Sequence, residues 1–109
     1  MLKLFIVSLL ALGVAQPASA STAEASIYHP WYNGRPTASG EVFRYYGLSA
    51  AHPWLPFGKY RVSYRGRSVV LRINDRLVLP RLDLSCGAAQ VLFGSCRDNL
   101  ATVTYTRID

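Results

Sequence analysis

Four acidic side chains within the body of the sequence are the first candidates for chemistry: Glu41, Asp75, Asp83 and Asp98. Glu41 follows an exposed Thr-Ala-Ser-Gly loop, Asp75 ends an apolar run, and Asp83 stands between two leucines. A carboxyl group where a buried strand opens into a loop can act as a general acid, because partial burial raises the pKa of such a group. Structural roles are also open: Asp75 could pair with Arg72 or Arg76, and Asp83 could cap a helix beside Ser85.

One histidine and several aromatic side chains form a second group of candidates. His52 closes an apolar segment; a lone histidine there is often structural, but beside an acid it can hold a proton or orient a carboxylate. Tyr28, Trp31, Tyr32 and Trp54 could form platforms for sugar rings or could fill the core of a small barrel. There is no glycine-rich phosphate loop, nucleophile elbow or metal motif, so we expect neither a cofactor nor a metal.

These candidates lie among segments whose residue pattern is typical of β-strands: 25–28, 60–64, 67–73 and 101–108. Arg65 and Gly66 predict a tight hairpin between the second and third segments. Val69, Val70 and Leu71 are apolar in succession, so we expect the third segment to be buried on both faces. A small, strand-rich chain with long loops favours a closed barrel.

One short helix is predicted over residues 86–93. Ser85 can cap its N-terminus, and Gly94 can end it in the left-handed conformation. The two cysteines, Cys86 and Cys96, are expected to form a disulfide in an oxidising compartment. Eight helical residues span roughly 12 Å, whereas bonded cysteines need Cα atoms within about 7 Å. The pairing therefore requires the chain to double back after Gly94, or a shorter helix.

Residues 1–20 have the three parts of a secretory signal: the positive Lys3, a short apolar run, and a small-x-small end at Ala20. The apolar run is about eleven residues long, whereas a spanning helix needs roughly twenty, so cleavage is favoured over a membrane anchor. Ser21 stands where a lipoprotein would carry its cysteine. We expect residues 21–109 to form one soluble domain with no membrane anchor.

The chain is basic, with a formal net charge of +6. Export argues against nucleic acid as a partner, and an anionic wall polymer or a phospholipid surface suits the charge better. An equally open interpretation is that the charge only keeps a small domain soluble.

Taken together, four segments resemble the rare lipoprotein A (RlpA) family of septal ring lytic transglycosylases: 35–41, 48–58, 66–76 and 82–85. The resemblance runs in order from about Ala25 to Phe93. It implies a mainly β fold, a six-stranded double-psi β-barrel with one short helix, related to expansins and barwin-like proteins. It also implies a location in the bacterial periplasm or at the cell-wall face, with peptidoglycan glycan strands as the partner. We expect the protein to be a monomer.

The resemblance implies cleavage of peptidoglycan glycan strands, preferably those lacking stem peptides, to leave anhydro-muramic acid ends. Asp75, Glu41 and His52 match the functional positions of the family. We expect Asp75 to be the acid and base, Glu41 and His52 to be its charge and orientation partners, and Asp83 to be a further acid in the cleft. The expected substrate-binding residues are Tyr28, Thr37, Ser39, Arg72, Asn74 and Arg76.

Two departures from the family pattern keep other functions open. Ile27 and His29 flank Tyr28 where the family usually has tryptophan and glycine, and the loop 77–81 is short and lacks Gly-Pro. That loop joins Asp75 to Asp83, so the spacing of the two acids is open. The alternatives are a non-catalytic, expansin-like wall-binding module and an inhibitor that uses the barrel as a scaffold.

Overall fold

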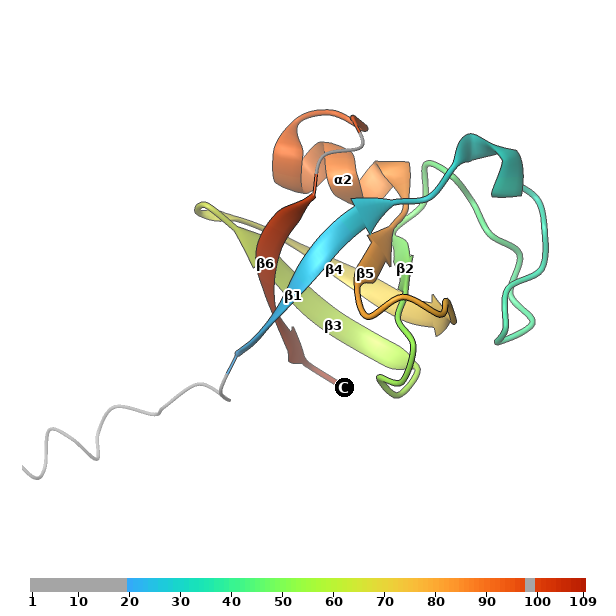
Figure 1. Cartoon of the computed structure of the whole chain (residues 1–109), viewed down its shortest axis with the longest axis horizontal. Coiled ribbons are helices and arrows are strands. Elements are labelled where there is room, and N and C mark those ends of the chain that lie inside the picture. Colours follow the sequence, from blue (N-terminus) through green and yellow to red (C-terminus); the bar gives the residue numbers. More distant parts are fainter. Residues whose placement is uncertain (1–19, 98–99) are drawn as a thin grey trace, which may run out of the picture.

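Six strands form a closed barrel in the order β1-β5-β2-β4-β3-β6 (Figure 1). The computed structural model describes residues 20–97 and 100–109. Its elements are β1 (Ser21–Ile27), the 3-10 helix η1 (Pro30–Tyr32), β2 (Ser49–Ala51), β3 (Gly58–Tyr64), β4 (Arg67–Asp75), β5 (Leu82–Leu84), α2 (Cys86–Phe93) and β6 (Ala101–Arg107). The expected six-stranded double-psi β-barrel with one short helix is therefore confirmed.

The barrel mixes parallel and antiparallel pairs. β1 runs parallel to β5 and β2 parallel to β4, whereas the other neighbours are antiparallel. The predicted hairpin is the β3–β4 pair, which turns at Arg65 and Gly66. β5 was not predicted as a strand, because three residues are too few to show an alternating pattern.

The barrel interior is filled by apolar side chains from all six strands, chiefly Ala25, Ala50, Val62, Leu71, Ile73, Leu82, Leu84 and Val103. The prediction that β4 is buried on both faces is wrong at Val70, which is 42% exposed while Val69 and Leu71 are buried. A barrel strand turns one face to the core, and Val70 lies on the outer face of β4, where it is only partly covered.

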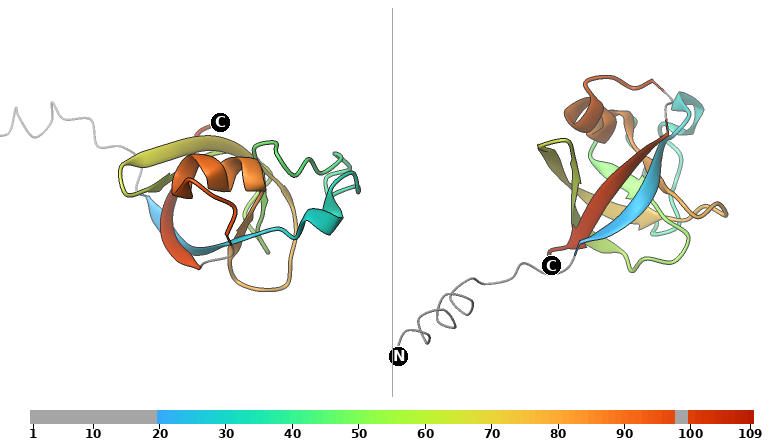
Figure 2. Two further views of the ribbon diagram at one scale, coloured as in Figure 1. Left: turned by 90° about the horizontal axis from the view of Figure 1, so that it is seen from above. Right: turned by 60° about the vertical axis from the view of Figure 1, so that its left-hand side comes forward.

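Helix α2 has the predicted bounds because both of its ends are capped. The Ser85 hydroxyl accepts a hydrogen bond from the Ala88 amide at 3.3 Å, and Gly94 has a φ of 80°. The chain doubles back after Gly94, so that Cys86 and Cys96 form the expected disulfide with a Cα–Cα distance of 5.2 Å. Figure 2 shows α2 lying across one end of the barrel.

Two predictions cannot be compared with the structure. Residues 1–19 of the proposed signal and the candidate acid Asp98 lie outside the described residues. In the ranges 20–97 and 100–109, no helix has the length and hydropathy to cross a membrane.

Candidate active site

The candidate site is built around Asp75, the last residue of β4. The register of β4 against β2 shifts there: Ala50 pairs with Ile73, but the next residue, Ala51, pairs with Asp75. A bulge of this kind redirects a side chain and is common beside active sites. Ile73, two residues earlier, faces the core, so strict alternation would turn Asp75 inward too, and the irregular register explains how the acid can instead emerge at the end of the strand.

Three donors hold the Asp75 carboxylate. The Tyr28 hydroxyl donates to Oδ2 at 2.8 Å, and the amides of Ala38 and Arg76 donate to Oδ1, each at 2.9 Å. These donors come from the end of β1, from a loop and from the residue after Asp75. Among the described residues Oδ2 accepts only the one bond, so a second lone pair remains on that oxygen to exchange a proton.

Tyr28 is a buried hydrogen-bond donor to the acid. Its side chain is 6% exposed and its ring stacks on Phe43 at a centroid distance of 4.1 Å. Burial, followed by the hydrogen bond to the Asp75 carboxylate and the charge of that group, raises the pKa of Tyr28 far above its usual range. The phenol therefore stays protonated and acts as a donor to Asp75.

Glu41 is an ionised carboxylate beside β4. Asn74 Nδ2 donates to Glu41 Oε1 at 2.8 Å, and the Arg72 guanidinium donates to Oε2. The Asn74 hydrogen bond, followed by Arg72, lowers the pKa of Glu41. All three side chains line a hollow of about 270 Å³, one residue along β4 from Asp75. Glu41 is thus placed to supply negative charge rather than a proton.

His52 is buried, with 3% exposure, and its ring braces the loop after β2. Its Nδ1 accepts hydrogen bonds from the amides of Trp54 at 3.2 Å and Leu55 at 3.1 Å. Burial, and then the charge of Arg76, lowers the pKa of His52, which favours the neutral ring. The His52 amide also donates to the Asp75 carbonyl at 3.1 Å, so the brace is tied to the residue that carries the acid.

Arg76 fastens the same loop from the other side. Its Nη1 donates to the carbonyls of His52 at 3.1 Å and Leu55 at 2.8 Å, and its guanidinium lies 4.1 Å from the centre of the Phe57 ring. These contacts occupy much of a group that was expected to bind substrate. The structure therefore assigns Arg76 a positioning contact with the loop.

Asp83 lies on the other side of β2 from Asp75. Ala51 pairs with Asp75 on β4 and with Asp83 on β5, so one strand separates the two acids. Two steps between neighbouring strands place their Cα atoms roughly 10 Å apart. The Ser26 hydroxyl donates to Asp83 Oδ1 at 2.8 Å. The short loop 77–81 therefore leaves both acids at the same end of the barrel.

Comparison with known proteins identifies the family of this barrel. A family model described as "Lytic transglycolase" matches residues 24–105, from β1 to β6, and this range contains Glu41, His52 and Asp75. The chain belongs to the lytic transglycolase family. It is 54% identical over 67 residues to the "Probable endolytic peptidoglycan transglycosylase RlpA" of Nostoc sp., a match that covers 56% of this chain and 18% of the relative.

Other similar proteins extend the comparison to the whole barrel. The "Endolytic peptidoglycan transglycosylase RlpA" of Pseudomonas aeruginosa is 41% identical over 91 residues, 78% of this chain and 26% of the relative. The chain thus spans about a fifth to a quarter of these curated relatives. A solved structure, the Streptomyces papain inhibitor, has a TM-score of 0.68 at 20% identity, over 84% of this chain and 96% of its own. At that identity it shows the shared fold alone.

The remaining expected site residues of this lytic transglycolase domain shape the loop that carries Glu41. The Thr37 hydroxyl donates to the Glu41 carbonyl at 2.7 Å and lies 2.9 Å from the Ser39 hydroxyl. The Ser39 amide donates to the Asn74 carbonyl at 3.1 Å, which fastens the loop to β4. Thr37 and Ser39 thus position Glu41 and the Ala38 amide.

The structure adds functional groups that the sequence did not reveal. Ala38 contributes a backbone amide to Asp75, Phe43 supports Tyr28, and Ser26 binds Asp83. The residue type of Ala38 did not indicate this role, because every residue except proline has a backbone amide that can donate. Its place between Thr37 and Ser39, in a loop that precedes a candidate acid, was the only available hint.

The aromatic candidates divide into two groups. Tyr28 is buried, whereas Trp31, Tyr32 and Trp54 are exposed. The guanidinium of Arg35 covers one face of Trp31 at 3.4 Å from the ring centre. Within the described ranges, no group of three or more His, Cys, Asp or Glu side chains could hold a metal ion.

Proposed function

We propose that this protein is a lytic transglycosylase that cleaves the glycan strands of peptidoglycan, with Asp75 as its acid and base. Membership of the family and the peptidoglycan transglycosylases among its relatives support the reaction class. The observation that carries the assignment of Asp75 is its set of donors, because three hydrogen bonds fix one carboxylate at an open strand end.

The proposed reaction uses one carboxyl group twice. Protonated Asp75 gives its proton to the glycosidic oxygen, and the bond between that oxygen and C1 of muramic acid breaks. The O6 hydroxyl of the same sugar attacks C1 and closes an anhydro ring, while its proton passes to the Asp75 carboxylate. The acid is regenerated and no water is consumed, so a second catalytic carboxyl group is not required.

Glu41 is proposed to stabilise positive charge at C1 as the glycosidic bond breaks. A fixed carboxylate beside a site of developing positive charge lowers the barrier, provided that it stays ionised. Its hydrogen bonds to Asn74 and Arg72 favour that state. Arg72 and Asn74 would then act on substrate through Glu41 and through the hollow that they line with it.

The other expected site residues are proposed to hold these groups in position. Tyr28 orients Asp75, while Thr37 and Ser39 set the loop of Glu41. His52 and Arg76 brace the loop that follows β2. Asp83 is proposed as a second acid of the same cleft, since one strand separates it from Asp75.

The substrate and setting are also proposals. We infer that the substrate is glycan whose stem peptides have been removed, and that the protein acts as a monomer. We also propose export to the periplasm or the wall face after cleavage behind Ala20. The start of β1 at Ser21 supports that boundary, because the whole barrel follows it. The mass of the protein recovered from the periplasm would test the cleavage site.

Digestion of peptide-free sacculi tests the function. The unmodified protein should release anhydro-muramic acid products, identified by mass, and Asp75→Asn should lower the rate about 100-fold or more. Asp83→Asn is the matched variant and should lower it less. Absence of anhydro products from the unmodified protein would exclude the enzyme, and binding to sacculi without cleavage would instead support a wall-binding module. Equal losses in the two variants would contradict the assignment of Asp75 as the acid and base of the reaction.

A further inference from the structure

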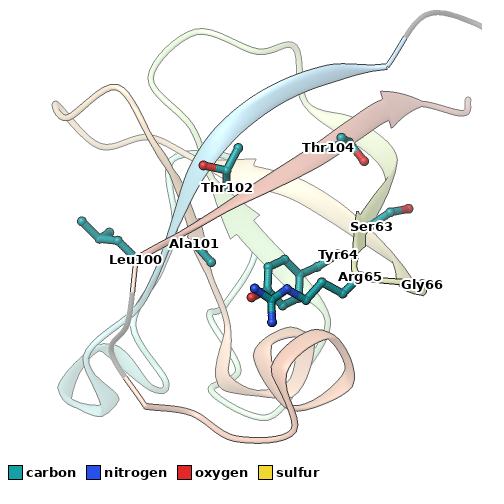
Figure 3. A pocket seen from close by; sticks show the side chains of 8 residues that line it. All are labelled: Ser63, Tyr64, Arg65, Gly66, Leu100, Ala101, Thr102 and Thr104. Atoms are coloured by element: carbon teal, nitrogen blue, oxygen red, sulfur yellow. The ribbon is translucent and has the colours of Figure 1, made fainter.

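A surface trough that is separate from the proposed active site lies at the tip of the β3–β4 hairpin. Two adjoining hollows form it, of about 660 Å³ and about 480 Å³, and both are lined by Tyr64, Arg65, Leu100 and Ala101. We call their union the hairpin trough. Figure 3 shows the larger hollow, with Arg65 extending past the Tyr64 ring toward Ala101 and Leu100.

The trough opens because the first residues of β6 pair with β1 but not with β3. Ser63 pairs with Thr104 as the last cross-strand pair of β3 and β6, whereas Ala101 pairs with Ala25 of β1. The hairpin tip and the start of β6 therefore diverge from a common point. Such a split leaves a groove on the outer surface rather than a cavity in the core.

The two halves of the trough differ in chemistry. Hydroxyl groups of Ser63, Thr102 and Thr104 line the larger hollow, and Arg67 and Arg97 join Arg65 in the smaller one. Neither of the two ion pairs found within residues 20–97 and 100–109 involves these arginines. A ligand with hydroxyl groups along its length and anionic groups at intervals would match both halves.

Within residues 20–97 and 100–109, an exposed acidic side chain borders the hydroxyl half. Glu24 of β1 pairs with Thr102 and is exposed. Its charge would repel an anion at that end and favour the arginine half. Among the described residues, the two halves of the trough therefore differ in charge.

The backbone conformation of Arg65 indicates that the turn alone does not explain why an arginine occupies this position. Arg65 has a φ of 47° and Gly66 a φ of 81°, so both residues of the turn are left-handed. A two-residue turn of this kind favours Asn or Gly at the first position, and a long side chain with a positive φ is uncommon. Turn chemistry therefore does not account for an arginine here.

Arg67 is positioned by the end of α2. Its Nη1 lies 3.5 Å from where a Cβ on Gly94 would stand, at the C-terminus of the helix. The carbonyl end of a helix attracts a cation, which favours this place for the guanidinium beside the trough.

We propose that the hairpin trough is a second glycan-binding site, which takes a polysaccharide strand carrying free carboxylate groups. The hydroxyl half would bind sugar hydroxyl groups, and the guanidinium groups would bind carboxylates in bidentate fashion. The proposal rests on the proposed function, because muramic acid exposes a lactyl carboxylate wherever its peptide has been removed.

This site is separate from the proposed active site. β4 runs from Arg67 at the trough to Asp75, and the eight residue steps between them span roughly 26 Å. Figures 1 and 2 show the hairpin tip and η1 on opposite sides of the barrel. A strand held in the trough would tether the protein to the wall while another stretch of glycan is cleaved.

Titration of the isotope-labelled Asp75→Asn protein, followed by nuclear magnetic resonance, tests the proposal. One probe is an oligomer of alternating N-acetylglucosamine and N-acetylmuramic acid with free carboxylates, and the other is an N-acetylglucosamine oligomer of equal length. The Arg65 and Thr102 amide signals should shift with the carboxylated oligomer alone. The Ala38 amide reports the active site separately, so a failure of the proposed function is distinguishable from a failure of the trough.

Variants that remove charge complete the test. Arg65→Asn combined with Arg67→Gln should weaken binding at the trough about tenfold or more, and Asn at a turn position with positive φ keeps the hairpin folded. Lys59→Gln combined with Arg61→Gln removes the same charge elsewhere on β3 and should change affinity less than about twofold. Equal binding of the neutral oligomer, equal binding of polyphosphate of matched charge, or equal losses in the two double variants would overturn the proposal.

Discussion

Asp75 illustrates how neighbouring groups fix the geometry of a candidate catalytic residue. Two backbone amides fix Oδ1 and one buried phenol fixes Oδ2. Because the amides belong to the backbone and Tyr28 is packed against Phe43, little side-chain freedom remains to be lost when substrate binds. The arrangement favours one orientation of the carboxyl group, with its open lone pair on Oδ2.

Tyr28→Phe tests whether the Tyr28 hydroxyl orients Asp75 or contributes to substrate binding. The variant loses only the hydroxyl donor to Asp75, so we expect kcat to fall about tenfold with KM nearly unchanged, and stability to fall by about 1 kcal/mol. Steady-state kinetics on peptide-free glycan oligomers and urea unfolding measure the two effects. Tyr32→Phe is the matched control, because Tyr32 is an exposed phenol of the same loop. A rise in KM with unchanged kcat would contradict a positioning role.

Glu41 should give stability a specific pH dependence. Its folded pKa is lowered from an ordinary 4.5, mainly by the Asn74 hydrogen bond, so the ionised form stabilises the fold. That contribution is present above the ordinary pKa and is lost as pH falls through the lower, folded pKa. The stability difference between the unmodified protein and Glu41→Gln should be at most about 1 kcal/mol at neutral pH, because the pair is half exposed, and should be smaller at an acidic pH below 4.5. Urea unfolding at both pH values measures it, and a constant difference would contradict the assignment.

The sequence revealed the acids of the site better than their environment. Asp75, Glu41 and His52 were identified from the residues and from the family resemblance, and the structure brings them to one end of the barrel. The amide of Ala38 and the loop contacts of Arg76 could not be predicted, because they depend on how a loop folds against β4. A backbone amide that acts as a hydrogen-bond donor in a site cannot be recognised from its residue type.

At the scale of elements, the sequence predicted the bounds of an element correctly where the residues at its ends act as a helix cap or form a turn. Ser85 and Gly94 predicted the bounds of α2, and the Arg65-Gly66 turn predicted the β3–β4 hairpin. The parallel pairing of β2 with β4 joins residues far apart in the chain, and no local pattern encodes it. Val70 was misassigned for a related reason, since the exposure of an outer strand face depends on what other elements leave uncovered.

Gly87 shows how packing between elements can reverse a local preference. Alanine inside a helix usually stabilises a protein relative to glycine by up to about 1 kcal/mol. A Cβ on Gly87 would lie 2.3 Å from the Gly47 carbonyl oxygen and 2.4 Å from that of Tyr46, so α2 would have to move off this loop. Gly87→Ala should therefore destabilise the protein by about 2–3 kcal/mol in urea unfolding. Gln90→Ala, on the exposed face of α2, should change stability by less than about 0.5 kcal/mol, and a more stable Gly87→Ala variant would contradict the packing.

At the scale of the whole molecule, the proposed active site and the hairpin trough lie at opposite ends of β4. The two sites differ in how their arginines are paired among the described residues: Arg72 forms an ion pair with Glu41 near the acid, whereas none of the three arginines in the trough belongs to either of the two ion pairs. The arginine cluster of the trough is therefore expected to act locally. It should concentrate the protein on an anionic polymer through the trough, while the acid end remains available to a second stretch of glycan.

Salt should therefore separate attachment from chemistry. Raising ionic strength from about 0.1 M to about 1 M shortens the screening length from about 10 Å to about 3 Å. We expect the fraction of protein that pellets with peptide-free sacculi to fall severalfold, while kcat on short oligomers at saturating concentration changes little. In the variant with Arg65→Asn and Arg67→Gln, pelleting should be weak at low salt and nearly independent of salt. If its salt dependence matched that of the unmodified protein, attachment would depend on charges elsewhere on the barrel, and the trough would not be the tether.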